Sequence, residues 1–237
     1  MRNYLYLTLL VISFYGCKKD NPVEPKDIGY DYFPTQLGHF VTYSCDSLVF
    51  PDIGTNTETY KFKIKEVIDS TFTDNSGRLS IRIARYKKWI QYDTIPVTDT
   101  TWHLQDIWWA NRTNTTAEVV EENVRFVKLA FPVEIYKIWN GNAQNSLGAT
   151  DYEYTSVDEP LTLSGLSYEK TINVNQSNDI NNPLFYRKDD EKYAKGVGLI
   201  YRENKDYTWE QDNGTILVGT IKYGLWYKMT AIAHGVE

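Results

Sequence analysis

Residues 60–65 read Tyr-Lys-Phe-Lys-Ile-Lys, and this stretch decides the fold class. Its apolar side chains, Tyr60, Phe62 and Ile64, fall on one parity, and three lysines fall on the other. Side chains of a β-strand alternate between two faces. The pattern therefore predicts a strand with one face on a core and the other face in water.

A second alternating stretch follows after a turn signal. Leu79, Ile81 and Ile83 share one parity, and residues 74–77 (Asp-Asn-Ser-Gly) lie between the two stretches. Small polar residues and glycine in this arrangement favour a tight turn. We therefore expect the two stretches to form a hairpin.

The last strand is expected to be long. Apolar residues share one parity across residues 217–229, and Gly219 and Gly224 predict bends or bulges within them. The sequence Asp-Asn-Gly at 212–214 predicts the turn that pairs this strand with residues 198–209.

The remaining chain repeats the same signals, and phenylalanine, tryptophan and tyrosine make up 15% of the residues. These residue types suit a pleated, half-buried surface. No long stretch shows the periodicity of a helix. Further strands are predicted at residues 40–49, 101–110, 117–121, 124–131, 151–157 and 167–174. The sequence thus predicts an all-β fold, a single antiparallel meander of roughly ten strands over residues 30–237. It forms an up-and-down barrel or a strongly curled open sheet, with a two-sheet sandwich as the alternative.

The first residues of the chain predict its location in the cell. An apolar run of about 11 residues is too short to span a bilayer as a helix, which takes roughly 20. It ends in Gly16-Cys17, the pattern of a lipoprotein signal. We expect residues 1–16 to be the signal peptide, Cys17 to be lipidated, and residues 17–29 to be a flexible tether at the outer membrane, on its periplasmic or cell-surface face. The alternative is an ordinary secretory signal in which Cys17 is incidental.

The net charge of the chain limits the classes of partner it can bind. The net charge is −6, which argues against nucleic acid because phosphate binding needs clustered basic residues. The one basic stretch, residues 82–88, is predicted to be the solvated face of a strand. Cys45, left alone once Cys17 is lipidated, is predicted to be a small buried hydrophobe.

Enzyme chemistry has little support in the sequence. There are three histidines, none in a metal-ligand spacing, and there is no nucleophile elbow or phosphate-binding loop. Residues 189–191 (Asp-Asp-Glu) are predicted to be a solvated turn. Of Glu121 and Glu122, one is expected to point inward, without an identifiable second group. We expect no catalytic residue, no metal and no cofactor.

The tryptophans are the better candidates for a binding site. Trp108 and Trp109 are adjacent in a predicted strand, so their rings point to opposite faces. Trp102 shares the parity of Trp108, and Trp139 begins a loop rich in asparagine and glycine. These four are the candidate ligand-binding residues, for a barrel-mouth amphiphile or for a sugar ring. The alternative is that they only fill the core.

Five segments carry a family resemblance: residues 31–34, 38–43, 121–129, 139–142 and 193–200. Together they resemble a family of uncharacterised lipoproteins from Bacteroidota-type bacteria, over nearly the whole mature chain. The resemblance implies a lipocalin-like or open-barrel fold and no assigned activity. The glycosylation signal of such bacteria, Asp followed by Ser or Thr and then an apolar residue or Thr, marks candidate sugar carriers at Ser47, Ser70, Thr94 and Thr100.

Two functions follow as hypotheses. The first is a non-enzymatic outer-membrane lipoprotein that binds a small apolar or amphipathic ligand or a glycan. The second is an accessory interaction subunit of an outer-membrane complex.

Overall fold

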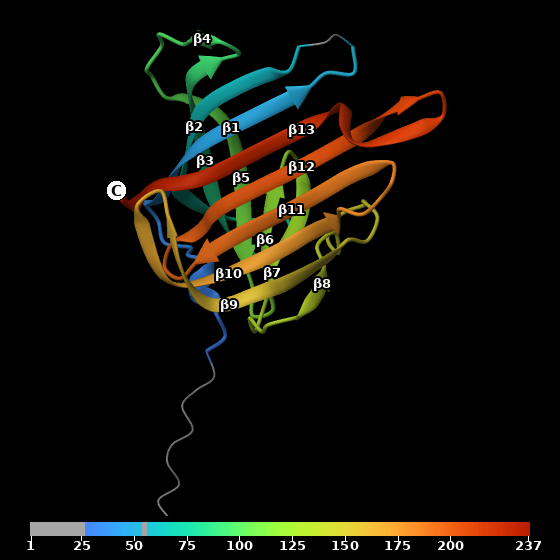
Figure 1. The fold of residues 1–237 in the computed structure, drawn as a ribbon. Helices are drawn as coiled ribbons and strands as arrows, with labels where there is room; N and C mark the ends of the chain where they lie inside the picture. Colours follow the sequence, from blue (N-terminus) through green and yellow to red (C-terminus); the bar gives the residue numbers. More distant parts are fainter. Residues whose placement is uncertain (1–26, 54–55) are drawn as a thin grey trace, which may run out of the picture.

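The strands form one antiparallel sheet that curls into a barrel (Figure 1). The computed structural model describes residues 27–53 and 56–237. A single turn of 3-10 helix, η1 (Tyr30–Tyr32), precedes the strands. The strands of the described residues are β1 (His39–Phe50), β2 (Glu58–Thr73), β3 (Leu79–Tyr92), β4 (Ile95–Pro96), β5 (His103–Arg112), β6 (Thr116–Glu121), β7 (Val124–Ala130), β8 (Ile138–Asn140), β9 (Asp151–Leu163), β10 (Leu166–Asp179), β11 (Phe185–Ala194), β12 (Gly198–Asp212) and β13 (Thr215–Val236).

The strand order confirms the predicted meander. It runs β7-β6-β5-β3-β2-β1-β13-β12-β11-β10-β9-β8, with the short β4 paired to β3 outside this path. Most strands that follow one another in the chain are also neighbours in the sheet, and β1 pairs with β13. All strands belong to one sheet, so the sandwich alternative does not form. The sheet is a nearly closed barrel with one seam, between β7 and β8.

Both predicted hairpins form. Strands β2 and β3 pair across residues 74–77, and β12 and β13 pair across residues 212–214. Gly219 and Gly224 have positive φ angles, and the register between β12 and β13 shifts near them, as expected for bends. At Gly224 a Cβ atom would lie 2.2 Å from the carbonyl oxygen of Asp206, so a side chain has no room there.

One predicted turn is a strand instead. Residues 189–191 lie within β11, which the sequence analysis missed. Their charges made them look like a solvated turn. The Glu191 side chain is in fact 1% exposed and pairs with the buried Lys128 of β7, which compensates its burial.

Side chains bridge the seam where the backbone ladder stops. The indole N–H of Trp139 donates to the carbonyl of Val127 (2.8 Å), and the Val127 N–H donates to the carbonyl of Gly141 (2.9 Å). The Tyr154 hydroxyl bonds to both the N–H and the carbonyl of Ala130, each at 3.0 Å. The exposed edge of β7 is thus satisfied without a strand partner.

Gly141 offers a test of this packing. A Cβ there would lie 2.3 Å from Cζ of Tyr152, whose ring is buried against the glycine. We expect Gly141→Ala to lower the free energy of unfolding by about 1–3 kcal/mol, the usual cost of overpacking. The matched control is Gly148→Ala, where nothing lies within 4 Å. Urea denaturation measures both, and equal stabilities would show that the seam tolerates displacement of the Tyr152 ring.

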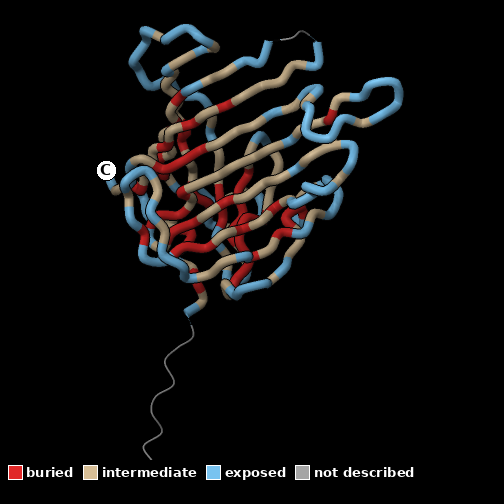
Figure 2. The backbone as a smooth tube through the Cα atoms, viewed as in Figure 1, coloured by how far each residue is buried: buried red, intermediate tan, exposed pale blue. Residues whose placement is uncertain are grey.

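The chain plugs one end of the barrel before the first strand begins. Arg112 donates to the carbonyl of Phe33 (2.9 Å), and the N–H of Gly196 donates to the carbonyl of Asp31 (2.8 Å). Ile28, assigned to the tether by its sequence, accepts from the N–H of Val133 (3.0 Å) at the same end. Figure 2 shows buried residues gathered toward this lower end in the view, and more exposed strands above.

The opposite end is uneven. The β6–β7 hairpin is short, whereas β2, β3, β12 and β13 continue well past it (Figure 1). One side of the wall therefore rises above the other at this end, which we call the mouth.

No helix among residues 27–53 and 56–237 is long and apolar enough to cross a membrane. The predicted signal peptide and the predicted lipidation site, Cys17, lie outside the described residues.

Candidate ligand cavity

A cavity of about 500 Å³ occupies the barrel interior. Strand register orders its lining from the plug to the mouth. Inward-facing residues nearest the plug are apolar, and they form what we call the floor: Phe33, Val41, Ile68, Ile81 and Val197. Farther from the plug the lining becomes charged. We call these charged residues the collar: Glu66, Arg85, Glu121, Lys128, Glu191 and Arg202.

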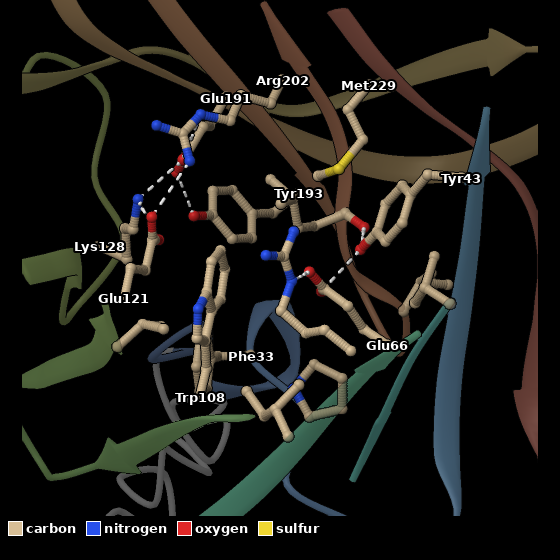
Figure 3. A pocket seen from close by; sticks show the side chains of 18 of the residues that line it. Phe33, Tyr43, Glu66, Trp108, Glu121, Lys128, Glu191, Tyr193, Arg202 and Met229 are labelled. Atoms are coloured by element: carbon tan, nitrogen blue, oxygen red, sulfur yellow. Dashed lines mark hydrogen bonds and ion pairs between the residues drawn. The ribbon is translucent and has the colours of Figure 1, made fainter. Parts of the chain in front are cut away.

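The first half of the collar is a four-residue ion network (Figure 3). Lys128 Nζ lies 2.7 Å from Oε1 of Glu121 and 2.9 Å from Oε1 of Glu191. Arg202 reaches the other oxygen of Glu121 at 3.3 Å. Tyr193 donates its hydroxyl to Glu191. Two cations thus bridge two carboxylates that come from β6 and β11.

A β-bulge puts Lys128 into this network. Ala117 of β6 faces Leu129, but the next residue, Glu118, faces Val127, so Lys128 has no partner in the register. Both Lys128 and Leu129 consequently point inward, although they are adjacent in the chain. Bulges often redirect a side chain in this way.

The second half of the collar centres on Arg85. Its Nε lies 2.8 Å from Oε1 of Glu66, and its guanidinium lies 3.5 Å from the centroid of the Trp108 ring. Tyr43 donates to the carbonyl of Leu199 (2.9 Å) and also lies 3.4 Å from Glu66. The arginine therefore combines an ion pair with a cation–π contact.

These partners fix the protonation states of the network. Burial opposes the charge of Glu121, but Lys128 and Arg202 outweigh it and lower the pKa of the carboxyl to about 2. Burial likewise opposes the charge of Lys128, yet Glu121 and Glu191 raise its pKa. Both groups stay charged at neutral pH, whereas a general acid or base works best with a pKa near the operating pH.

Cys45 is buried on the inner face of β1, as predicted, and burial raises the pKa of its thiol to about 12. A thiol, not a thiolate, is therefore present at neutral pH.

Among the described residues, no three His, Cys, Asp or Glu side chains gather in a way that could hold a metal ion.

The structure does not bring the four candidate tryptophans together. Trp108 lines the cavity, and its indole N–H donates to Glu122 (3.3 Å). Trp109 lies on the outer face, as adjacency in a strand requires. Trp102 is 39% exposed beyond the start of β5, and Trp139 lies at the seam.

The glycosylation candidates differ in accessibility. Ser47 is buried on the inner face of β1. Ser70 is half-buried on β2, and Thr94 and Thr100 are exposed.

The collar was largely missed in the sequence. Residues 82–88 were predicted to be a solvated face, and this is wrong for Arg85, which is buried and points inward. The signal was present, because Arg85 shares the parity of Ile81 and Ile83. Glu66 likewise shares the parity of Ile64. Glu121 is the inward-facing carboxylate that was expected.

Comparison with known proteins adds little. No family model matches the chain, and no curated protein matches it. A crystal structure from Bacteroides fragilis, described as a "putative exported protein with YmcC-like fold", aligns at 10% identity and a TM-score of 0.44, over 86% of this chain and 98% of that one. A likeness this distant carries no conclusion about what this chain binds or does.

Proposed function

We propose that the protein binds one small amphipathic molecule inside its barrel and does not transform it chemically. The observation that carries the proposal is the cavity of about 500 Å³ with an apolar floor and a charged collar. Ligand sites typically enclose ~300–1,000 Å³ and combine apolar walls with a few placed polar groups.

The order of the lining sets the orientation of the ligand. An apolar tail on the floor, beside Ile81 and Ile83, removes hydrocarbon from water. The polar head then lies at the collar, near the mouth. The collar carries three cations and three carboxylates, so it favours a head without net charge, either neutral or zwitterionic. Nε of Arg202 is buried without a hydrogen-bond partner and is a donor that such a head could use.

The test is native mass spectrometry of the full chain in a mild detergent, before and after denaturation. We expect a small mass that co-purifies and is lost on denaturation. Ile83→Trp fills the cavity and should abolish capture. The matched control is Ile107→Trp on the neighbouring strand β5, whose side chain is 44% exposed outside the barrel, and it should retain capture.

Two outcomes would contradict the proposal. One is an empty mass in the unsubstituted protein that also stays empty after incubation with a neutral or zwitterionic single-chain lipid. The other is equal capture by the Ile83→Trp and Ile107→Trp variants.

The proposal also covers the location of the protein. We propose that Cys17 carries lipid and holds the protein at the outer membrane, with the mouth accessible to the ligand. Its support is the signal pattern of residues 1–17 and the entry of the chain at the plugged end, where Asp27 pairs with Lys195. Denaturing mass spectrometry tests it, since acylation adds mass to a chain that begins at Cys17.

A role as an accessory subunit of an outer-membrane complex is the second candidate. The β12–β13 hairpin reaches beyond the barrel and exposes Leu217, Val218 and Tyr223, with Val218 67% exposed. Apolar side chains at such a tip favour contact with another protein. Cross-linking from position 218 in intact cells distinguishes the two functions, because an empty cavity together with one specific cross-linked protein would favour this role.

A further inference from the structure

A second hollow lies on the outside of the barrel, away from the cavity. It measures about 250 Å³ and is lined by residues 72–76, Trp109 and Arg125. The tip of the β2–β3 hairpin forms one side of it, and the outer face of β5 and β7 forms the other. Trp109 reaches this face because its neighbour Trp108 points into the barrel.

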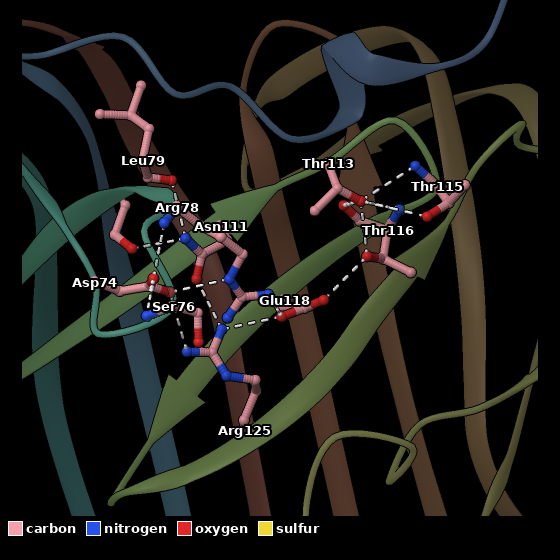
Figure 4. A network of polar contacts seen from close by, with 11 residues as sticks. Asp74, Ser76, Arg78, Leu79, Asn111, Thr113, Thr115, Thr116, Glu118 and Arg125 are labelled. Carbon is pink, nitrogen blue, oxygen red and sulfur yellow. Dashed lines mark hydrogen bonds and ion pairs between the residues drawn. The ribbon is translucent and has the colours of Figure 1, made fainter.

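An ion network holds the hairpin tip in place (Figure 4). Arg78 Nε lies 3.0 Å from Oδ2 of Asp74, and Arg78 also pairs with Glu118 at 3.0 Å. Arg125 pairs with the same oxygen of Glu118 at 3.0 Å and donates to the side-chain oxygen of Asn111 (2.7 Å). Glu118 is 3% exposed, so the tip is fastened to a buried carboxylate.

The turn itself is ordered by the same aspartate. Oδ1 of Asp74 accepts from the N–H groups of Ser76 and Arg78, each at 2.9 Å. The hollow is therefore built on a turn whose backbone is already ordered before a ligand binds.

The charges of this hollow are balanced. The two arginines, Arg78 and Arg125, pair with the two carboxylates, Asp74 and Glu118. A ligand with a net charge would find no uncompensated partner. The hydrogen-bonding groups left free are neutral: within the described part of the chain, the side chains of Asn75 and Ser76 and the indole N–H of Trp109 make no hydrogen bond.

We propose that this hollow binds one ring of a neutral saccharide. The rings of Trp109 and Phe72 offer flat apolar surfaces to the C–H face of a sugar, and Asn75 and Ser76 offer donors and acceptors to its hydroxyl groups. The hollow of about 250 Å³ is smaller than the ~300–1,000 Å³ typical of pockets for drug-sized ligands, which suits a single ring.

Indole N–H resonances provide the test, because the chain has seven tryptophans and each gives one signal. The full chain labelled with ¹⁵N is titrated with D-glucose, D-galactose, D-mannose, N-acetyl-D-glucosamine, maltose and cellobiose. We expect at least one of these sugars to shift a single indole signal, the one that is missing from Trp109→Phe. Trp109→Ala should weaken the binding about tenfold, because the indole ring supplies the larger of the two flat apolar surfaces of the hollow.

Two further variants test whether the effect is specific to this hollow. Asn75→Ala changes a turn side chain without a hydrogen bond of its own, so it should fold normally and still weaken binding. Trp102→Ala removes an exposed tryptophan that does not line the hollow and should leave binding unchanged.

The proposal is overturned if no indole signal moves at the highest sugar concentrations, or if the sugars move the Trp108 signal instead. It is also overturned if Trp109→Ala binds as tightly as the unsubstituted chain. A shift produced only by a peptide with an aromatic side chain would assign the hollow to a protein partner. Ile83→Trp, which blocks the cavity, should leave sugar binding intact, so this site and the proposed amphiphile site fail or succeed separately.

Discussion

Replacing Lys128 with methionine lowers the free energy of unfolding by about 3–5 kcal/mol, as expected when one partner of a buried ion network is removed. The ammonium group is 2.7 Å from Glu121 and 2.9 Å from Glu191, and the Lys128 side chain is 4% exposed. Without it, two buried carboxylates share Arg202 as their remaining cation in the collar. Urea denaturation measured by circular dichroism gives the free energy.

A matched lysine isolates the effect of burial. Lys170 pairs with Asp158 at 3.5 Å, with side chains 51% and 44% exposed, so Lys170→Met should change the stability by at most ~1 kcal/mol. Adding Glu191→Gln to Lys128→Met removes one of the stranded charges. The double variant should then lose less stability than the sum of the single variants. Similar losses for Lys128→Met and Lys170→Met would show that water reaches the collar and screens it.

Local alternation was enough to predict the wall of the barrel. Residues 60–65 and 79–83 repeat every second residue because each strand has one face on the interior, and this signal is contained in a few residues. The two hairpin turns could also be predicted. At residues 212–214, Asp-Asn-Gly favours the left-handed backbone that Asn213 and Gly214 adopt.

The collar could not be predicted by the same rule. Charged side chains are almost never fully buried unless they are paired, and the partners of Lys128 lie on β6 and β11, which only the closure of the barrel brings together. The parity of Arg85 and Glu66 was visible, but their pairing across β2 and β3 was not. At Lys128 even parity fails, because the bulge moves its side chain to the inner face.

The seam was beyond prediction for a related reason. Strands β7 and β8 are consecutive in the chain, so a meander predicts that they pair. In the structure β8 has three residues, and Trp139 and Tyr154 occupy the edge of β7 in its place. Such contacts depend on how the whole sheet closes, and a short strand gives almost no pattern of its own.

The second large effect is a dependence of stability on pH that comes from Glu121. Lys128 and Arg202 outweigh the burial of this carboxyl and lower its pKa from 4.5 to about 2. A depressed pKa contributes stability that is present above pH 4.5 and is lost as the pH falls from 4.5 toward 2. The difference between the two values corresponds to about 3 kcal/mol. Glu121→Gln cannot ionise, so it should be about 3 kcal/mol less stable than the unsubstituted chain at pH 7.

The test is the difference in the free energy of unfolding between the unsubstituted chain and Glu121→Gln. This difference should decrease steadily below pH 4.5, because protonation removes from the unsubstituted chain the charge that Glu121→Gln already lacks. Urea denaturation at pH 7, 5, 4 and 3 measures the difference. Glu159→Gln, at an exposed position, is the control and should stay within ~0.5 kcal/mol of the unsubstituted chain throughout. A gap that stays constant with pH would mean that Glu121 acts through its shape and hydrogen bonds rather than its charge, and the collar would then be a polar lining whose ion pairs do not set the stability of the barrel.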